Sequence, residues 1–257
     1  MRVLVTFAVD AEFAPWRKLR RFHESILCAE HWTGGLRVET AQIGDHTLYV
    51  FLTGMGIRCF DFAISKCFKN EGVEVVISSG LAGSLKESYP ALTVVCPSRV
   101  GGLADATGTA VTRAVFQLAV RSRATAIDTL LTSSRLIDSH EEKARLSTFA
   151  DAVDMESRHI LESFLAEQIP VGVIRAISDG SEEDLPIDFE KCLTSSGRLK
   201  TLPLLKELVS KPAKISELIR FGRQSRAAAE KLVGFLDAFI QNLKPEFLLN
   251  VEAEKVV

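Results

Sequence analysis

Four segments of this chain are rich in apolar and β-branched residues. They lack the strict apolar/polar alternation of a strand that exposes one face to solvent. They are RVLVTFAV at 2–9, VEVVISSG at 73–80, LTVVCPSRV at 92–100 and VGVIRAISDG at 171–180. Such runs are typical of strands buried on both faces, as in a parallel sheet covered by helices. The pattern therefore limits the chain to folds with a central, largely parallel sheet.

Helical patterns and a turn lie between these strands. Helices are predicted from Asp10 through Trp16 to Arg21, over Ile57–Asn70 and over 154–168, and two strands around the Gly44-Asp45 turn. Strands that alternate with helices predict an α/β class fold, here one three-layer α/β/α domain with a mixed, parallel-rich twisted sheet over residues 1–200.

The last third of the chain has a different pattern of apolar residues. Apolar residues recur at helical spacing, at Ile215, Leu218, Ile219, Leu232, Leu236, Phe239, Ile240 and Leu243. We expect a helical hairpin within residues 201–245, packed on the same domain, and a loose tail at 246–257. Arg220, Arg223 and Arg226 are interpreted as a solvated helix face, with a membrane-surface or phosphate-binding role as the alternative.

Charge and composition exclude several classes of partner. The 257 residues include 31 basic and 33 acidic side chains, for a net charge of -2, so no overall field favours nucleic acid. No apolar run approaches the ~20 residues of a membrane-spanning helix. The N-terminal apolar stretch is too short for a signal peptide and is followed directly by acidic residues. Five widely spaced cysteines without a CxxC pair argue against a disulfide framework and a zinc ribbon, and the histidines lack metal-ligand spacing. We expect a cytoplasmic protein without a metal.

Polar residues and glycines gather where predicted strands end. The segments are 8–12 (AVDAE), 53–56 (TGMG), 78–83 (SSGLAG) and 177–180 (ISDG), with 152–156 (AVDME) at the start of a helix. Open α/β sheets collect ligands at the carboxyl ends of their strands. Each segment alone has a structural explanation, because carboxylates cap helices and glycines form tight turns.

In this order and spacing the segments resemble the nucleoside phosphorylase/nucleosidase superfamily over roughly residues 1–190. The resemblance is greatest to methylthioadenosine/S-adenosylhomocysteine nucleosidases. VDMES at 153–157 resembles the family's ribose motif, AISDG at 176–180 its purine-binding aspartate motif, and SSGLAGSL at 78–85 its glycine loop. The resemblance implies a nucleoside phosphorylase-like fold and an enzyme that breaks the N-glycosidic bond of a purine nucleoside.

The resemblance also implies roles for individual residues. Asp179 would protonate N7 of the departing purine, with Ser178 orienting it. Glu156 would hold the ribose hydroxyls above Met155, and Glu12 would deprotonate water, although Asp10 is an alternative base. Further substrate contacts are expected from Gly54, Gly56, Ser79, Gly80, Leu81, Ala82, Gly83, Leu136 and Ile137.

Water or phosphate could be the second substrate, and no cofactor is implied. Phosphorylases of the family usually carry an arginine just before the glycine loop, whereas residues 75–79 hold no cation and Leu81 replaces a small hydroxyl residue. Hydrolysis is favoured, although Arg17 or Arg58 could reach a phosphate. The expected substrate is an adenine-type nucleoside with a 5′ substituent. An adenosyl-lipid such as adenosylhopane is an alternative, since the C-terminal helices could cover an apolar group.

Two functions from other classes have less support from the sequence. A purine-binding protein without activity would be expected to lose Glu12, Glu156 or Asp179, and all three are present. An NAD-dependent oxidoreductase needs GxGxxG after its first strand, where this chain has no glycine. The resemblance further implies a homodimer.

Overall fold

The computed structural model describes residues 1–28, 35–57, 60, 62–103, 105–186 and 214–246. Its strands are β1 (Arg2–Phe7), β2 (His23–Leu27), β3 (Leu36–Ile43), β4 (His46–Leu52), β5 (Val75–Ser84), β6 (Val94–Gly102), β7 (Asp105–Ala110), β8 (Thr125–Thr132), β9 (Ala152–Asp154) and β10 (Val171–Asp179). Its helices are α1 (Asp10–Leu19), the short 3-10 turn η1 (Met55–Ile57), α2 (Phe62–Asn70), α3 (Arg113–Arg121), α4 (His140–Leu146), α5 (Ser157–Ala166) and α7 (Ile215–Gln241).

The predicted central strands form the middle of one sheet. β1 pairs in parallel with β4 and β5, and β5 pairs in parallel with β10. Every residue of β10 is buried, as are all but the first of β1. The sequence prediction of strands enclosed on both faces is confirmed for β1, β10 and the predicted part of β5, whereas β6 exposes Arg99.

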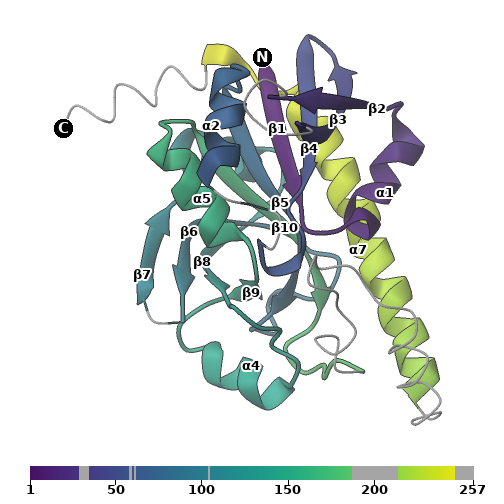
Figure 1. The fold of residues 1–257 in the computed structure, drawn as a ribbon. Coiled ribbons are helices and arrows are strands. Elements are labelled where there is room, and N and C mark those ends of the chain that lie inside the picture. The colour runs from purple at the N-terminus through teal and green to yellow at the C-terminus, as the bar shows by residue number, and fades with distance from the viewer. Residues whose placement is uncertain (29–34, 58–59, 61, 104, 187–213, 247–257) are drawn as a thin grey trace.

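The sheet also curls on itself (Figure 1). β10 pairs with β6 as well as with β5, and the path β6-β8-β9 returns to β5, so five strands form a closed ring. Beyond β1, the order β4-β3-β2 continues as an open antiparallel extension. The sheet is therefore mixed, and its ring brings the ends of β5, β9 and β10 together.

Helices cover both faces, and two apolar cores result. On one face, Phe13 and Trp16 of α1 pack with Val115 of α3 and with α7. On the other, Phe68 of α2 and Phe164 of α5 pack against the sheet, with ring centroids 6.2 Å apart. The three-layer α/β/α architecture predicted from the sequence is confirmed.

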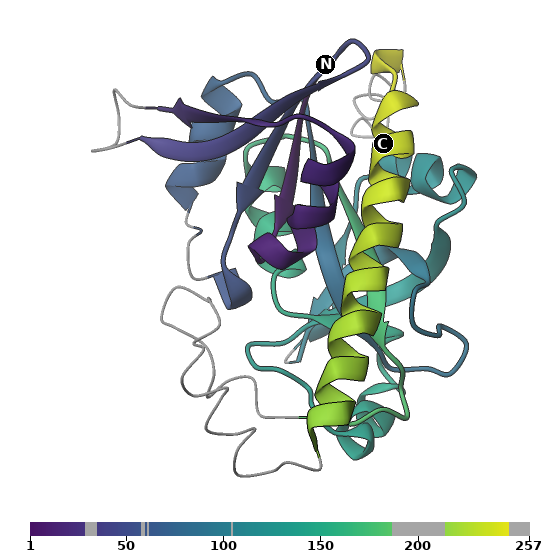
Figure 2. The ribbon, with the colours of Figure 1, turned by 90° about the vertical axis from the view of Figure 1, so that its right-hand side faces the viewer.

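The expected helical hairpin is wrong, because residues 215–241 form one continuous helix of 27 residues, α7 (Figure 2). Its C-terminal half buries Leu232, Leu236 and Phe239 completely. Asp237 on the same half accepts a hydrogen bond from Trp16 Nε1 of α1 at 3.0 Å. Glycines within a helix cost only about 1 kcal/mol each, so neither Gly222 nor Gly234 breaks it.

Several elements differ from the sequence prediction. The helix expected from Ile57 begins at Phe62, after the 3-10 turn. β2, β7, β8 and β9 were not predicted from the sequence; β2 reads HESIL and has no buried residue, so it carries no apolar pattern. The boundary expected at residue 200 and the tail lie outside the described residues.

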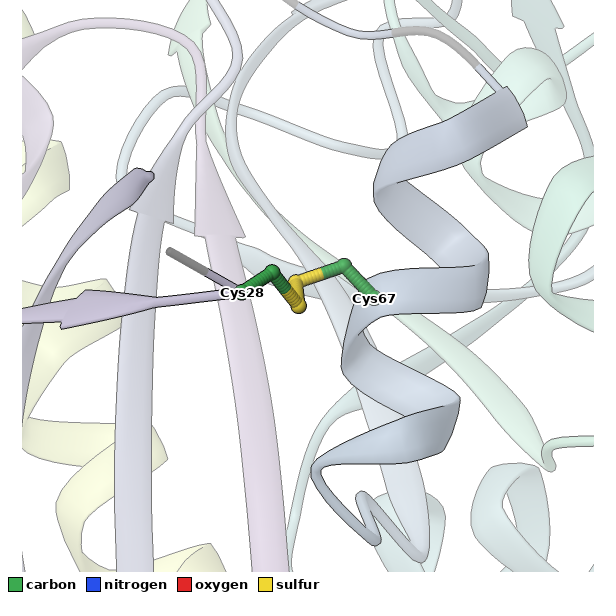
Figure 3. The surroundings of a disulfide bond; sticks show 2 residues. All are labelled: Cys28 and Cys67. Atoms are coloured by element: carbon green, nitrogen blue, oxygen red, sulfur yellow. A yellow bond between two sulfur atoms is a disulfide. The ribbon is translucent and has the colours of Figure 1, made fainter. Parts of the chain in front are cut away.

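Cys28 and Cys67 form a disulfide that joins the end of β2 to α2 (Figure 3). The expectation of no disulfide is therefore corrected. The two cysteines lie 39 residues apart, so tertiary structure pairs them and local spacing gave no sign of it. Burial raises the pKa of the free Cys96 thiol to about 12, which keeps it protonated. Within the described residues, no helix is long and apolar enough to cross a membrane.

Candidate active site

The predicted site segments converge on β5. Glu12 stands in the first turn of α1 after β1, Glu156 precedes α5 after β9, and Asp179 ends β10. Residues 81–83 follow the strand predicted over 73–80 and were expected in the glycine loop, but they continue β5, because the ring pairs Gly80 with Arg175 and Gly83 with Asp179. Paired strands hold these backbone atoms more rigidly than a loop would.

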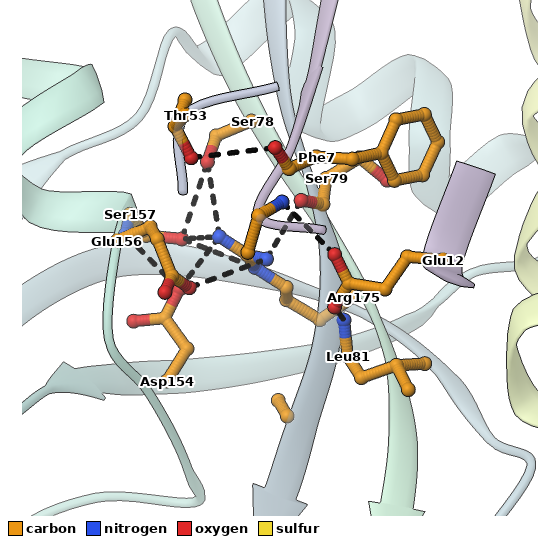
Figure 4. Close-up of polar contacts among 12 residues, drawn as sticks. Phe7, Glu12, Thr53, Ser78, Ser79, Leu81, Asp154, Glu156, Ser157 and Arg175 are labelled. Atoms are coloured by element: carbon orange, nitrogen blue, oxygen red, sulfur yellow. Dashed lines mark hydrogen bonds and ion pairs between the residues drawn. The ribbon is translucent and has the colours of Figure 1, made fainter. Parts of the chain in front are cut away.

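The Glu12 carboxylate is buried and bound by three backbone N–H groups (Figure 4). Leu81 N donates to Oε1 at 2.9 Å, and Ala8 N and Val9 N donate to Oε2 at 2.9 and 3.2 Å. Burial raises the pKa of Glu12, while the Leu81 N–H and the Arg175 charge oppose that shift. A carboxylate offers about four acceptor positions, so one remains for a ligand.

Asp10, the alternative base, lies outside this site. Its side chain is 62% exposed and pairs with Arg17, which also bonds Glu39 at 2.7 Å. The structure thus brings Glu12 and not Asp10 to the strand ends.

Arg175 is the hub of the buried polar network, and it is fully inaccessible to solvent. Its Nη2 lies 2.7 Å from Asp154 Oδ2 and donates to Ser157 Oγ at 2.9 Å. Nη1 donates to Ser79 O at 2.7 Å and lies 4.0 Å from Glu156 Oε2 (Figure 4). One guanidinium therefore links β5, β9 and the start of α5.

Glu156 Oε1 accepts a hydrogen bond from Gly56 N at 2.9 Å. Burial, and then the nearby Asp154 charge, raise the pKa of Glu156 to about 8. At neutral pH the group is therefore largely protonated in the empty site and can donate as well as accept. Met155 approaches the same turn, since its Cε would lie 3.6 Å from a Cβ on Gly56.

Gly80 is the point of closest approach between Arg175 and Glu12. It has φ of +140°, a conformation that side chains avoid. A Cβ there would overlap the Arg175 guanidinium and lie 3.0 Å from Glu12 Oε1. Position 80 therefore has to be a glycine for Arg175 and Glu12 to keep their places beside β5.

Asp179 is buried beside Gly83, where a Cβ would lie 3.0 Å from its Oδ2. Ser178 Oγ donates to Asp179 Oδ1 at 2.5 Å and lies 3.3 Å from Ala82 O. Lys143 Nζ donates to Oδ2 at 2.6 Å. Since Gly83 follows Leu81 by two residues, the attachment points of Asp179 and Glu12 on β5 are ~7 Å apart.

The other predicted contacts are distributed unevenly. Gly54 has φ of +74° and begins the turn that carries Gly56. Ile137 packs into a small apolar cluster with Leu85 and Val153, and Leu136 is half-buried next to it. Ser79 Oγ is buried and has no hydrogen-bond partner among the described residues.

Sequence reasoning gave no role to Arg175, Asp154, Ser157 or Lys143. Arg175 carried a usable signal, because a charged residue within the buried strand VGVIRAIS requires a buried partner. Lys143 carried none, since HEEKARL reads as a surface helix. Among the described residues no group of three or more His, Cys, Asp or Glu is placed to hold a metal ion.

Comparison with known proteins identifies the family and the fold of this chain. A model of the phosphorylase superfamily matches residues 2–209. The 5′-methylthioadenosine/S-adenosyl homocysteine nucleosidase of Campylobacter jejuni matches with a TM-score of 0.68 and 15% identity, covering 95% of this chain and 100% of that one. A search of curated proteins finds no match.

Two Helicobacter pylori structures are similar to the same degree. The nucleosidase with butyl-thio-DADMe-Immucillin-A has a TM-score of 0.69 at 17% identity, covering 95% and 99% of the two chains. A futalosine hydrolase mutant has a TM-score of 0.66 at 17% identity, covering 95% and 100%. These likenesses establish the fold. With the family model matching most of its length, the chain belongs to the phosphorylase superfamily, as an enzyme of the nucleosidase or phosphorylase type.

Proposed function

We propose that this enzyme hydrolyses the N-glycosidic bond of a 5′-substituted, adenine-type nucleoside and releases the free base. The observation that carries the proposal is the Glu12 carboxylate, buried against the N–H groups of Ala8, Val9 and Leu81. A fixed negative charge at that place suits a water molecule and opposes a phosphate dianion.

The cations near the site support water as the acceptor. Arg175 is paired with Asp154 at 2.7 Å and Lys143 with Asp179 at 2.6 Å, so each buried cation already has an anion. Arg17, which could have reached a phosphate, pairs with Asp10 at the surface. Arg58 lies outside the described residues. Phosphorolysis needs a cationic pocket for its dianion, and the described cations do not supply one.

Glu12 has the properties of a general base. Burial raises its pKa, which strengthens it as a proton acceptor. Attack by water at the anomeric carbon would place the water proton on Glu12. As positive charge develops on the sugar, the carboxylate of Glu12 and the Glu156 oxygens would stabilise it.

Departure of the purine is assigned to Asp179. The bond between sugar and purine breaks with its electron pair on the base, so the base needs a proton. Asp179 is held on two sides by Ser178 and Lys143, which fixes its direction. Met155, half-buried against Gly56, would pack beneath the ribose.

The 5′ substituent is proposed by analogy with the structural neighbours described as 5′-methylthioadenosine/S-adenosylhomocysteine nucleosidases. An adenosyl-lipid is the second candidate, favoured by exposed apolar residues on the first half of α7. Ile215 is 41% and Ile219 49% exposed there. A turnover that does not change with 5′ chain length would remove the lipid candidate.

We further propose a homodimer, whereas the Cys28–Cys67 disulfide counts against the reducing cytoplasm expected from the cysteine spacing. Phe62, at the start of α2, is 58% exposed, as expected for an interface residue. Light scattering at two protein concentrations would test the dimer.

The direct test is purine release from methylthioadenosine, S-adenosylhomocysteine, 5′-deoxyadenosine, adenosine and inosine, with and without phosphate. Release without phosphate, and its loss by ~100-fold or more in Asp179→Asn, is the expected result. Asp45→Asn is the control, since Asp45 is exposed in the turn between β3 and β4, away from the site. Release that requires phosphate would make the enzyme a phosphorylase, and no release from any of them would contradict the proposal.

A further inference from the structure

Lys143 is a fully buried lysine that points from α4 at the end of β10. Its ammonium donates to Asp179 Oδ2 at 2.6 Å, to Gly180 O at 2.8 Å and to Glu183 O at 2.8 Å. An ammonium group has three N–H donors, and here each has its own acceptor. The site is thus shaped for a lysine in its charged form.

The buried ammonium requires a counter-charge, and Asp179 provides it. Two of the three acceptors are neutral carbonyls, so the negative charge must come from the carboxylate. Asp179 Oδ1 accepts from Ser178 Oγ at the same time. The ion pair with Lys143 uses the Asp179 charge, so a proton for the purine has to come through a partner of Asp179.

We propose that Lys143 holds the proton that Asp179 passes to the leaving purine. This inference rests on the proposed N-glycosidic cleavage. When the bond to the sugar breaks, its electron pair stays on the purine, which takes a proton at N7 from Asp179. That proton reaches Asp179 from Lys143 in the same step, so Asp179 is a carboxylate both at the start and at the end. Lys143 is left as a neutral amine and is protonated again from solvent after the base departs.

Contacts from α4 and α7 fix the turn that follows β10. Glu183 Oε2 accepts from Gln224 Nε2 at 2.8 Å and from Gly180 N at 3.3 Å, which fixes the turn after β10 against α7. Asp184, paired with His140 of α4 at 2.9 Å, adds a second exposed negative charge nearby. The turn that carries two of the three acceptors of Lys143 is therefore fixed by both helices.

Lys143 acts on the substrate only through Asp179 and is therefore a positioning residue. A purely structural role would affect every substrate alike, whereas a proton supply matters only when the leaving group needs a proton. A purine leaves poorly as an anion, but 4-nitrophenolate leaves readily. The ratio of turnover on a purine nucleoside to that on 4-nitrophenyl β-D-ribofuranoside separates the two roles.

The experiment compares wild type, Lys143→Met and Lys143→Arg on the nucleoside that wild type cleaves best and on the nitrophenyl riboside. We expect Lys143→Met to lose ~100-fold or more on the nucleoside and a few-fold on the riboside. Lys143→Arg should lose the nucleoside activity too, because a guanidinium keeps its charge but does not release a proton. Lys231→Met, exposed on α7, is the control and should match wild type on both.

Two results would overturn the inference while leaving the proposed function in place: an equal loss on both substrates, or nucleoside turnover in Lys143→Arg close to wild type. Lys143→Gln replaces Lys143→Met if circular dichroism shows the latter unfolded. If wild type releases no purine, the proposed function fails, and the inference fails with it.

Discussion

Arg175 Nη2 and Asp154 Oδ2 lie 2.7 Å apart, and neither side chain has any surface in contact with solvent. The pair joins the middle of β10 to the end of β9 across the closed part of the sheet. Its desolvation is offset by further hydrogen bonds, from Arg175 to Ser78 Oγ at 3.1 Å and from Thr132 Oγ1 to Asp154 at 2.7 Å.

Removing one member of this pair should destabilise the fold strongly. Arg175→Met leaves the Asp154 charge buried without its partner, so we expect a loss of about 3–5 kcal/mol in the free energy of unfolding. Arg226→Met breaks an exposed pair with Glu230 and should cost less than ~1 kcal/mol. Urea unfolding measures both, and similar losses in the two variants would contradict the assigned role.

Glu12 and Asp10 can be separated by a matched pair of amide substitutions. Glu12→Gln removes the base and sets an amide NH₂ against backbone donors, so hydrolysis should fall ~100-fold or more. Asp10→Asn loses a surface ion pair with Arg17 and should keep near-normal turnover. Purine release per folded enzyme is the measurement. The reverse pattern would identify Asp10 as the base.

Stability should fall as the pH rises from about 5 to about 8. The pKa of Glu156 is raised from 4.5 to about 8, so between these values the folded state holds a proton that the unfolded state has released. Rising pH then favours unfolding. Glu156→Gln should flatten this slope, leaving the contribution of the same sign from Glu12. Urea midpoints at pH 5, 6, 7 and 8 test it, and unchanged slopes in the variant would refute it.

Gly80→Ala should damage the site and the fold together. The new Cβ would overlap Arg175 at a backbone φ of +140° that alanine avoids. Gly234→Ala is the control, because nothing lies within 4 Å of its Cβ position in α7. An alanine in a helix interior should stabilise by up to about 1 kcal/mol. Thermal melting should therefore move in opposite directions for the two variants.

The Cys28–Cys67 bond should be detectable and stabilising. Denaturation with an alkylating reagent should label two fewer cysteines before reduction than after it. Cys28→Ala closes no loop and should lower the unfolding free energy by about 2–5 kcal/mol. Equal labelling before and after reduction would show that the bond does not form.

The sequence predicted best what local pattern determines. β1, β5 and β10 were visible because buried strands need unbroken apolar runs, and the site segments because each follows such a strand. The turn at Gly44 was found for the same local reason: Gly44 has φ of +57° and separates β3 from β4.

What the sequence missed depends on contacts between distant residues. Lys143 meets Asp179 across 36 residues, and Ser79 meets Arg175 across 96, so no local spacing marks either pair. β2 is polar because it lies at the open edge of the sheet and needs no apolar face. The helical hairpin was wrongly expected because helical spacing does not show whether a long pattern turns back.

α7 gives this enzyme an order of assembly. Gln224 Nε2 on that helix donates to Ser178 O at 2.8 Å, so a residue late in the chain holds the backbone beside Asp179. During synthesis, β1, β5 and β10 emerge first and can pair, yet the turn after β10 lacks this support until α7 has left the ribosome. The strands of the sheet can therefore pair before the backbone beside Asp179 is supported, and Asp179 takes its final position only once α7 has packed.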